Sequence, residues 1–501
     1  MFSSIIGLGR LEKAVLVVFS AISSQVFAQG VIAPGPAMNL ARSGHTATLL
    51  ADGTVLIAGG NSGLVLNAET YDPSTGALTP TGPMVNDYAT ATLLPDGRVL
   101  LVGAIAQLYN PSTRTFAVAR IGTTDYGCAA TLLNNGKVLF TGDPPPYGPS
   151  ATAELYDPET GNFAPTGQYA SIEIARMDHA TGPSNGGSDC RRATLLANGT
   201  ILVVVGIAAE IHDPQTNAFS LTGTLTKYPS GLVSTLPLWQ DPSRATLLLN
   251  GMVLFSGGDG DLGPSSEAWL YDLSTGTFQP TGPMITPRAE NTVTLLPDGT
   301  VFAAGSYELG GDLNPNPRAI GATEFYDSTA ATFFNSPDRI TPRFDHTATL
   351  LADGRVFIAG GTTGVYAPPG SGYSVLSTTE LYTPRVVIPA PRLFSLSGDG
   401  RGQGAIWNSA TGIVASPGSP AVAGDILSMY TSNLAEGGVI PPHVIVGCRL
   451  AEILYFGSAP GYPGYYQVNF RVPSGVAPGS AVPVRSNYLN RTSNKVTIGL
   501  L

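Results

Sequence analysis

The sequence contains little charge, few cysteines and no long apolar segment in its main part. Charged residues make up 12% of the 501 residues, about half the usual share. The formal net charge is −10 and Lys and Arg form no cluster, so we expect neither nucleic acid nor an anionic membrane surface as a partner. The three cysteines, Cys128, Cys190 and Cys448, exclude a scaffold built on disulfides. No segment after the N-terminal region is apolar and long enough to span a bilayer.

Residues 1–28 have the pattern of a signal peptide. Arg10 and Lys13 precede an apolar run over 14–22, and Val26-Phe27-Ala28 offers a small-residue cleavage site. A membrane anchor is the alternative, but this run is too short to cross a bilayer. We therefore expect a secreted, periplasmic or cell-surface protein whose mature chain begins at Gln29.

One hairpin pattern occurs seven times along the chain. Each copy has an Ala-Thr-Leu-Leu segment (Val-Thr-Leu-Leu in the sixth), then Asp-Gly or Asn-Gly, then a second apolar run. Asp-Gly and Asn-Gly between apolar runs are a strong hairpin signal, because these residues accept the positive φ of a tight turn. The seven copies are residues 47–53, 91–97, 130–136, 193–199, 245–251, 293–299 and 348–354.

A second element follows each hairpin and completes a four-stranded unit. Its first part reads like Glu69-Thr-Tyr-Asp-Pro73 and predicts a third strand and a turn. Its second part reads like Leu78-Thr-Pro-Thr-Gly-Pro-Met84 and predicts a short fourth strand. Four strands per unit and a spacing near 50 residues are typical of β-propeller blades. The alternative, a β-solenoid, would have shorter units.

These motifs resemble kelch repeats over roughly residues 38–388. The resemblance rests on an Arg-x-x-His segment before the first strand, a Gly-Gly after the second strand and the Tyr-Asp-Pro turn. It implies a seven-bladed β-propeller. The seventh unit lacks the Pro-Thr-Gly-Pro-Met strand, and a similar segment, Val31–Met38, precedes the first unit. We expect residues 29–38 to close the ring as the outer strand of the last blade, which would hide two sheet edges.

Residues 389–501 differ from the repeats and predict a second domain. Short strand-like runs such as 425–430, 443–447 and 465–472 are separated by Gly/Pro turns, which is typical of a small Ig-like β-sandwich. The segments 454–461, 466–473 and 475–479 resemble an uncharacterised C-terminal domain of exported acidobacterial proteins. The expected domains are therefore a signal peptide (1–28), the propeller (29–388) and this all-β domain (389–501).

Strand alternation assigns the connections to two faces of the propeller. The turns between first and second strands, and between third and fourth strands, are all tight and share one face. The other face receives the long insertions and the blade-to-blade crossings, where a site is expected because long loops in compact folds are often functional. These insertions are residues 167–192, 223–244, 306–321 and 362–377.

Residues just before the inner strands are expected at the mouth of the channel on that face. For those that recur in several blades, among them Arg42, His45, Arg343 and His346, we keep the alternative that they brace neighbouring blades. Residues that occur once are better binding candidates, although an ordinary solvated loop is the alternative for them. The candidate binding residues are Asp178, His179, Arg191, Arg192, Trp239, Asp241, Arg244, Arg288, Glu290, Arg343, Asp345 and His346.

The sequence offers no motif for catalysis, a metal or a cofactor. An exported kelch propeller with a C-terminal β domain also resembles galactose-oxidase-type copper enzymes, which need a Tyr-His pair and a Tyr crosslinked to a Cys. None of the five histidines here follows a Tyr, and His212 takes the Tyr place of a Tyr-Asp-Pro turn. No zinc spacing, nucleophile elbow or phosphate loop occurs. Cys128 and Cys190 precede equivalent strands of adjacent blades and can pair in an oxidising compartment, or stay as two buried thiols.

The sequence therefore favours an exported, monomeric binding or scaffold protein without a cofactor. It would engage a glycan or a protein through the loop-rich face of the propeller. The alternative is an extracellular carbohydrate-active or galactose-oxidase-like enzyme.

Overall fold

A computed structural model describes most of the chain, and its described residues form strands and turns without a helix. No helix in these ranges could therefore span a membrane. The described residues are 30–60, 67–85, 90–103, 105–121, 129–141, 152–169, 192–205, 208–224, 244–260, 263–309, 317–367 and 370–501.

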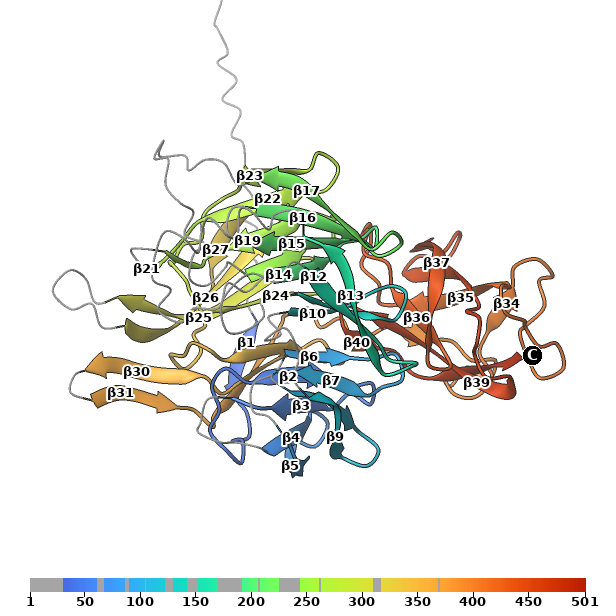
Figure 1. Ribbon diagram of the computed structural model, residues 1–501, viewed down its shortest axis with the longest axis horizontal. Helices are drawn as coiled ribbons and strands as arrows, with labels where there is room; N and C mark the ends of the chain where they lie inside the picture. The colour runs from blue at the N-terminus through green and yellow to red at the C-terminus, as the bar shows by residue number, and fades with distance from the viewer. Residues whose placement is uncertain are drawn as a thin grey trace, which may run out of the picture.

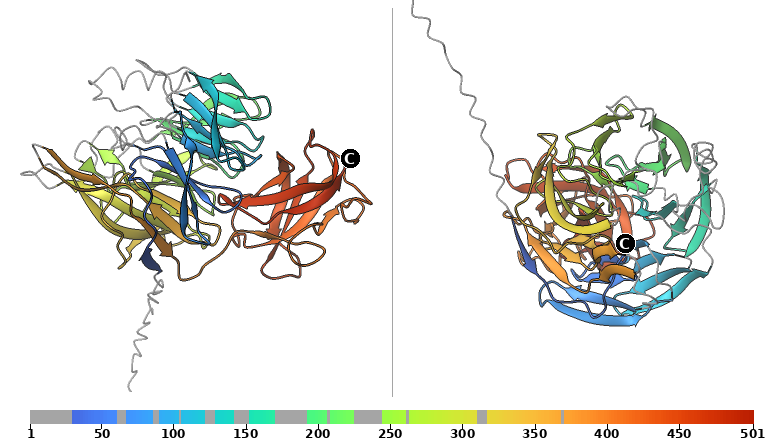
Figure 2. Two further views of the ribbon diagram at one scale, coloured as in Figure 1. Left: turned by 90° about the horizontal axis from the view of Figure 1, so that it is seen from below. Right: turned by 90° about the vertical axis from the view of Figure 1, so that its left-hand side faces the viewer.

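Seven blades surround a central axis, and the right-hand view of Figure 2 shows them as a ring. The first strand of each blade contacts the first strands of both neighbouring blades, and these contacts close into a circle. The seven-bladed all-β propeller predicted from the repeats is therefore confirmed. The strands of blades one to three are β2 (Thr46–Leu49), β3 (Val55–Ala58), β4 (Asn67–Asp72), β5 (Ala77–Pro83); β6 (Thr90–Leu93), β7 (Val99–Val102), β8 (Ile105–Asn110), β9 (Thr115–Ile121); β10 (Ala129–Leu132), β11 (Val138–Thr141), β12 (Thr152–Asp157) and β13 (Asn162–Gln168).

Blades four to seven have the same four-strand order, and blade seven is completed from the N-terminal end. Strand β1 (Val31–Pro34) pairs antiparallel with β32, with Val31 opposite Thr383. This pairing joins the two ends of the repeat region and leaves no open seam between blades one and seven. The remaining strands are β14 (Arg192–Leu195), β15 (Ile201–Val205), β16 (Ala208–Asp213), β17 (Ala218–Thr224); β18 (Arg244–Leu247), β19 (Val253–Ser256), β22 (Ala268–Asp272), β23 (Thr277–Pro280); β24 (Thr292–Leu295), β25 (Val301–Leu309), β26 (Pro317–Asp327), β27 (Thr332–Asn335); β28 (Thr347–Leu350), β29 (Val356–Ala359) and β32 (Thr379–Thr383), with a small hairpin β20 (Asp259–Gly260) and β21 (Gly263–Pro264) in blade five.

The repeated Tyr and Thr-Gly residues join each blade to the next. The blade tyrosines are fully buried, and the Tyr271 hydroxyl lies 2.7 Å from Thr222 Oγ1 of the preceding blade. Gly167 N–H donates to the carbonyl of Asn217 in the next blade. In blade four, His212 takes the tyrosine place, and its Nε2 lies 3.3 Å from Thr166 Oγ1. These motifs recur because each blade packs on the next in the same way, so every interface needs the same contacts.

Two of the expected insertions form paired strands. β25 and β26 continue beyond the blade as a hairpin arm, and so do β30 (Thr362–Ala367) and β31 (Gly370–Val375) of blade seven. The two arms meet edge to edge at Arg318 and Val365. They project together on the left of Figure 1, away from the C-terminal domain.

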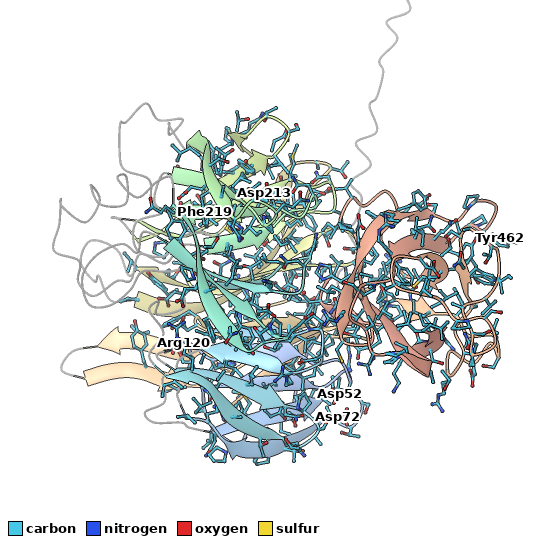
Figure 3. The ribbon with its side chains drawn as sticks, turned by 45° about the vertical axis from the view of Figure 1, so that its right-hand side comes forward. Asp52, Asp72, Arg120, Asp213, Phe219 and Tyr462 are labelled. Atoms are coloured by element: carbon cyan, nitrogen blue, oxygen red, sulfur yellow. The ribbon has the colours of Figure 1, made fainter. Side chains whose placement is uncertain are left out.

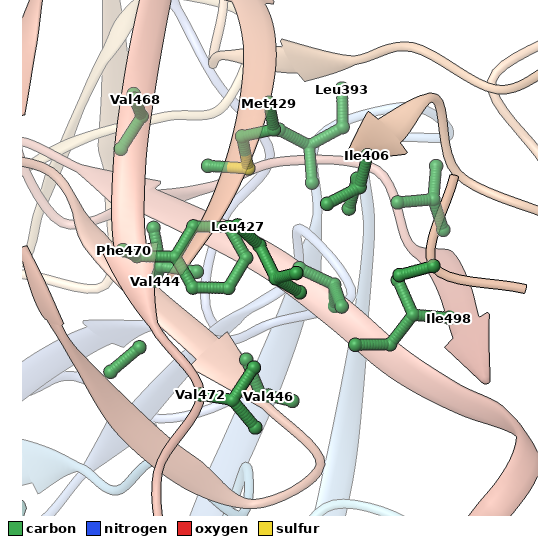
Figure 4. Packing of buried hydrophobic residues seen from close by; sticks show 14 of the residues in the cluster. Leu393, Ile406, Leu427, Met429, Val444, Val446, Val468, Phe470, Val472 and Ile498 are labelled. Atoms are coloured by element: carbon green, nitrogen blue, oxygen red, sulfur yellow. The ribbon is translucent and has the colours of Figure 1, made fainter. Parts of the chain in front are cut away.

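The C-terminal domain is one curled sheet that folds over its own core. Its strands run in the order β33-β35-β38-β37-β36-β39-β40, with β34 paired to β35 and β41 to β39. Leu427, Met429, Val444, Val468 and Phe470 are buried between its two layers (Figure 4). The strands are β33 (Arg392–Leu393), β34 (Ile406–Asn408), β35 (Ile426–Ser432), β36 (His443–Val446), β37 (Arg449–Ser458), β38 (Tyr465–Arg471), β39 (Gly479–Tyr488), β40 (Arg491–Thr492) and β41 (Val496–Leu500).

Candidate functional site

The C-terminal domain covers the face of the propeller that carries the tight turns. Val439 N–H donates to the carbonyl of Leu249, in the turn between β18 and β19, at 2.8 Å. Arg449 forms an ion pair with Glu159, in the turn between β12 and β13. Asp52 and Asp72 lie on this face as well, on the side of the propeller that Figure 3 shows toward the C-terminal domain. Among the described residues, the opposite face therefore remains the open one.

The channel along the propeller axis is closed at its covered end by the β39–β40 hairpin. Leu489 and Asn490 form the tip of this hairpin with φ of 51° and 59°, the left-handed values of a tight type I′ turn. Leu489 packs against the core of its own domain and against the blade core that contains Leu296 and Leu350. Behind it lies a cavity of about 620 Å³, lined mainly by the Ala-Thr-Leu segments of the inner strands. Its walls are nearly uncharged.

Two carboxylates, Glu290 and Asp345, lie at the open end in strained backbone conformations. Their φ angles are 49° and 54°, values that cost a non-glycine residue on the order of 1 kcal/mol or more. The N–H of Asp345 donates to the carbonyl of Glu290, and Gly44 N–H donates to the carbonyl of Asp345. The equivalent position in blade one is thus a glycine, which adopts this φ at little cost. Strain kept at a carboxylate is a feature of functional sites.

The paired arms stand beside these carboxylates and form a wall. At their base, Tyr307, Phe344 and Tyr373 pack edge to face, with ring centroids 5.6 Å and 5.5 Å apart. The hydroxyl of Tyr373, on β31, donates to the carbonyl of Pro317, on β26, at 3.2 Å. Hydrogen bonding and ring packing therefore hold the two arms as one unit. The open mouth is a rigid rim on this side.

Arg288 and Arg343, which were candidate binding residues, are buried in blades six and seven. Arg288 Nη2 lies 2.8 Å from Glu324 Oε1, and its Nη1 donates to the carbonyl of Gly305 at 2.7 Å. Arg343 repeats this arrangement with Glu380 and Gly360. Burial lowers the pKa of both guanidinium groups, and the glutamate partners oppose that shift. These contacts fasten each arginine-bearing segment to its own blade, so Arg343 has the bracing role that we kept as its alternative, and Arg288 has the same role.

The repeated glycines after the second strands let these braces fit. A Cβ on Gly305 would lie 2.5 Å from the Arg343 carbonyl of the next blade, and one on Gly360 would lie 2.4 Å from that of Arg42. Only glycine therefore lets the Arg-bearing segment approach the preceding blade so closely. Arg42 completes the pattern in blade one through Glu69.

His45 and His346 lie in the same seams and are also buried. His45 Nε2 is 3.0 Å from Thr347 Oγ1, and His346 Nε2 is 3.0 Å from Thr292 Oγ1. Burial lowers the pKa of His45 to about 3, with the charges of Arg42 and Arg343 contributing. His45 is therefore neutral at physiological pH and acts as a hydrogen-bonding part of the seam. Glu290 and Asp345 remain the candidate residues placed at the open mouth.

The other candidates lie outside the part of the chain that the structure describes. For Arg192 and Arg244, only the backbone, at the start of β14 and β18, is described. The binding predictions for this set, and the disulfide, stay predictions. The undescribed residues are Asp178, His179, Arg191, Trp239, Asp241, Cys128 and Cys190.

The described residues do not form a copper centre. They contain no group of three or more His, Cys, Asp or Glu side chains placed to share a metal ion. His45, His212 and His346 lie in different seams, each beside a threonine hydroxyl. Cys448 is exposed in the C-terminal domain. The described ranges therefore contain no set of side chains that could hold copper, and no reaction step is assigned to that metal.

A second hollow, between the two domains, has no counterpart in the sequence predictions. It has a volume of about 1100 Å³ and is lined by propeller turns on one side and by the β37–β38 region on the other. Asp213, labelled in Figure 3, belongs to the propeller wall, and Tyr455 to the domain wall. Leu454 and Tyr455 of β37 both line it and are both exposed, at a bulge in the pairing of β37 with β38, and no pattern in the sequence marks them.

Comparisons with known proteins identify the fold. A solved structure of a fungal alcohol oxidase of the AA5 family, in complex with copper, matches with a TM-score of 0.54 and 14% identity, covering 95% of this chain and 99% of that one. The structure of YjhT matches with a TM-score of 0.41 and 14% identity over 69% and 95% of the two chains, a likeness too low to carry an argument. No family model matches the chain, and no curated protein does. The chain therefore shares the overall architecture of this alcohol oxidase structure, and at such identity the likeness concerns the fold alone.

Proposed function

We propose that this is an exported, non-catalytic binding or scaffold protein that engages a glycan or a protein through the open face of its propeller. The observation that carries the proposal is the asymmetry of the two faces. The C-terminal domain occupies the face with the tight turns, and the β39–β40 hairpin closes the channel there. The strained Glu290 and Asp345 and the wall of paired arms lie at the opposite, open mouth.

The chemistry of the open mouth suits recognition. Its two carboxylates can accept hydrogen bonds from sugar hydroxyls or peptide N–H groups. The guanidinium groups of the nearby Arg288 and Arg343 are ion-paired with Glu324 and Glu380, respectively. The arms supply a wall whose position is fixed by the Tyr373–Pro317 hydrogen bond. A rigid rim favours binding because little conformational entropy is lost when the ligand arrives.

The test is a glycan array and a protein-capture screen with the chain lacking its predicted signal peptide. A variant with a shortened arm joins Tyr307 to Ala319 through Asn-Gly, since these residues are paired neighbours on β25 and β26 and Asn-Gly closes a two-residue hairpin. We expect a ligand for the parent chain and its loss in this variant and in Glu290→Gly. Absence of any ligand, or binding that survives both changes, contradicts the proposal.

The alternative is an extracellular carbohydrate-active or galactose-oxidase-like enzyme. Its support is the fold shared with the copper-containing alcohol oxidase. The described residues add no ligand set for copper, so the binding function is preferred. Metal analysis of the purified chain separates the two.

A further inference from the structure

The outer face of the C-terminal sheet carries two rows of side chains, one across four strands and one across three. In the first row, Trp407 on β34 pairs with Ser428 on β35, Ser428 pairs with Asn469 on β38, and Asn469 pairs with Tyr455 on β37. Alternate residues Leu427, Met429, Val468 and Phe470 enter the core, so the row residues face the other way. With strands about 4.8 Å apart, the row from Trp407 to Tyr455 spans about 14 Å.

The second row is Tyr430, Gln467 and Gly457, and its glycine leaves room for the Tyr455 ring. Tyr430 pairs with Gln467, which pairs with Gly457. A Cβ on Gly457 would lie 2.9 Å from the Tyr455 hydroxyl oxygen and 3.3 Å from its Cζ. The Tyr455 ring therefore rests over the glycine, and 44% of this side chain is exposed. Part of this ring is therefore available to a ligand in solvent.

A second aromatic group lies at the other end of the rows. The rings of Trp407 and Tyr430 are 5.9 Å apart between centroids, in an edge-to-face arrangement. Such pairs are a preferred aromatic geometry and fix each ring in place. The platform, which we define as Trp407, Ser428, Tyr430, Tyr455, Gln467 and Asn469, thus has aromatic rings at both ends and polar groups between them.

Hydrogen bonds within the platform orient its central amides. Asn469 Oδ1 accepts from Ser428 Oγ at 2.8 Å and from Gln467 Nε2 at 2.9 Å. Because both amides have their orientation determined in this way, Asn469 Nδ2 and Gln467 Oε1 are left for a ligand. No described residue is bonded to either atom. A donor and an acceptor side by side match the vicinal hydroxyl groups of a sugar, each of which donates and accepts.

The charges beside the platform are paired with each other. Arg471 Nε lies 2.8 Å from Glu452 Oε2, in the row next to Asn469 and Tyr455. The platform itself contains only hydroxyl, amide, indole and phenol groups. An uncharged surface of this kind complements an uncharged polymer and gives no attraction to an anionic one.

The platform opens into the hollow between the two domains. Tyr455 lines that hollow, and the facing propeller wall carries Asp213 and the neutral residues Asn198, Gln215 and Thr200. The three neutral residues are polar, like the centre of the platform. An extended chain lying along the rows would therefore continue into a groove that is also mainly polar.

We propose that the platform and the adjoining groove form a binding site for a neutral polysaccharide chain. The rings stack against the apolar faces of sugar units, since the negative π face attracts the polarised C–H groups. Asn469 donates to sugar hydroxyls and Gln467 accepts from them. The site lies on the C-terminal domain, so it is independent of the function proposed for the open propeller face.

Affinity electrophoresis tests the proposal. The full chain without its predicted signal peptide is run in native gels that contain hydroxyethyl cellulose, xyloglucan, galactomannan or dextran, and in gels with polygalacturonate as the anionic comparison. At least one neutral polymer is expected to retard the chain, and polygalacturonate is not. Trp407→Ala and Tyr455→Ala are each expected to weaken the retardation about tenfold, as loss of about 1.4 kcal/mol would.

Matched variants separate stacking from folding. Tyr455→Phe keeps the ring and is expected to bind like the parent. Asn469→Asp keeps the acceptor for Ser428 and Gln467 but loses the outward N–H groups, so it is expected to bind less. Tyr462→Ala removes a tyrosine that is 64% exposed but lies outside the platform, at the end of the domain farthest from the propeller in Figure 3, and it should leave binding unchanged.

Two results would overturn the proposal. One is that none of the neutral polymers retards the parent chain. The other is that retardation persists in Trp407→Ala and Tyr455→Ala variants whose melting temperatures match the parent. The shortened-arm variant keeps the platform, so its retardation should be unchanged even when binding at the open face is lost.

Discussion

The repeated tyrosines of the blades and Tyr455 of the C-terminal sheet are placed in opposite ways. Tyr71, Tyr156 and Tyr326 are at most 1% exposed, whereas Tyr455 is 44% exposed. The blade rings recur at one position per repeat and bond to the neighbouring blade, as Tyr326 does to Thr281 Oγ1 at 2.8 Å. The sheet rings occur once each. The repeated tyrosines hold the ring of blades together, and Tyr455 faces solvent.

Ion pairs show the same division. Arg288 and Glu324 are fully buried, whereas Arg471 and Glu452 are largely exposed. A buried charge that loses its partner is costly, because water cannot solvate it. An exposed pair contributes little, because water and salt screen it. The comparison can therefore be tested with matched substitutions in the two regions.

The largest effect is expected from the buried pair. Glu324→Ala leaves the Arg288 guanidinium buried without its carboxylate, so we expect a loss of about 3–5 kcal/mol in the free energy of unfolding. Glu452→Ala, its exposed counterpart, should lose less than about 1 kcal/mol. Urea denaturation of both variants measures this. Equal losses of stability in the two variants would show that the buried and the exposed ion pair contribute alike.

Acid should weaken the seams of the propeller. The pKa of His45 is lowered to about 3 in the folded chain from its ordinary value of 6.5, so below pH 6.5 the unfolded chain binds a proton that the folded chain does not. Stability is therefore fully present above about pH 6.5 and is lost as the pH falls toward 3. Between pH 6.5 and 4.5 this one group should cost about 2 kcal/mol.

The control for this loss of stability at acid pH is the variant His45→Gln. This variant has no titratable group in the seam, so its stability should fall less steeply over the same pH range. Thermal melts of both chains between pH 4.5 and 7.5 provide the measurement. Parallel pH curves for the two chains would show that His45 does not carry the effect.

A smaller effect is expected for one hydroxyl group. Tyr271→Phe removes the hydrogen bond to Thr222 in a buried seam and should cost about 1 kcal/mol. Tyr455→Phe removes a hydroxyl on the exposed platform and should change stability by less than about 0.5 kcal/mol. The denaturant concentrations at the unfolding midpoints, compared at an unchanged m-value, give both changes in the free energy of unfolding. A larger cost at Tyr455 than at Tyr271 would reverse the comparison.

The smallest effect on stability is expected at the open mouth. Glu290 has a φ of 49°, so Glu290→Gly relieves backbone strain while it removes a carboxylate. We expect unfolding stability to stay within about 0.5 kcal/mol of the parent or to rise. Thermal melts measure this, with Arg288→Ala as the destabilised control. A loss of several kcal/mol would mean that the Glu290 carboxylate holds the fold rather than the site.

The propeller could be predicted from the sequence because its signals are local and repeated. The glycine of the Asp-Gly or Asn-Gly turn has a positive φ in all seven hairpins, as Gly53 does at 91°, so the pattern is recognisable even where single copies are degenerate. The outer strand of blade seven could be placed because one unit lacked a strand that the N-terminal segment contained. That segment, β1, reaches its partner β32 only because the ring of blades closes.

The rest of the candidate site could not be predicted, because it depends on contacts between distant residues. The arms were expected as loops, yet β26 and β30 pair through Arg318 and Val365 across two blades. The platform brings Trp407 and Tyr455 into one row through two intermediate strands, and the order of strands in the sheet differs from their order in the chain. The docking of the C-terminal domain likewise depends on surface shape, for which the sequence has no periodic signal.

We propose that this chain uses a fold shared with a copper-containing alcohol oxidase for binding rather than for copper chemistry. Metal analysis of the purified chain after incubation with Cu(II) and removal of excess ion tests it most directly. We expect no copper to be retained at the level of one ion per chain. One tightly held copper per chain, together with oxidation of an alcohol by O₂, would contradict it.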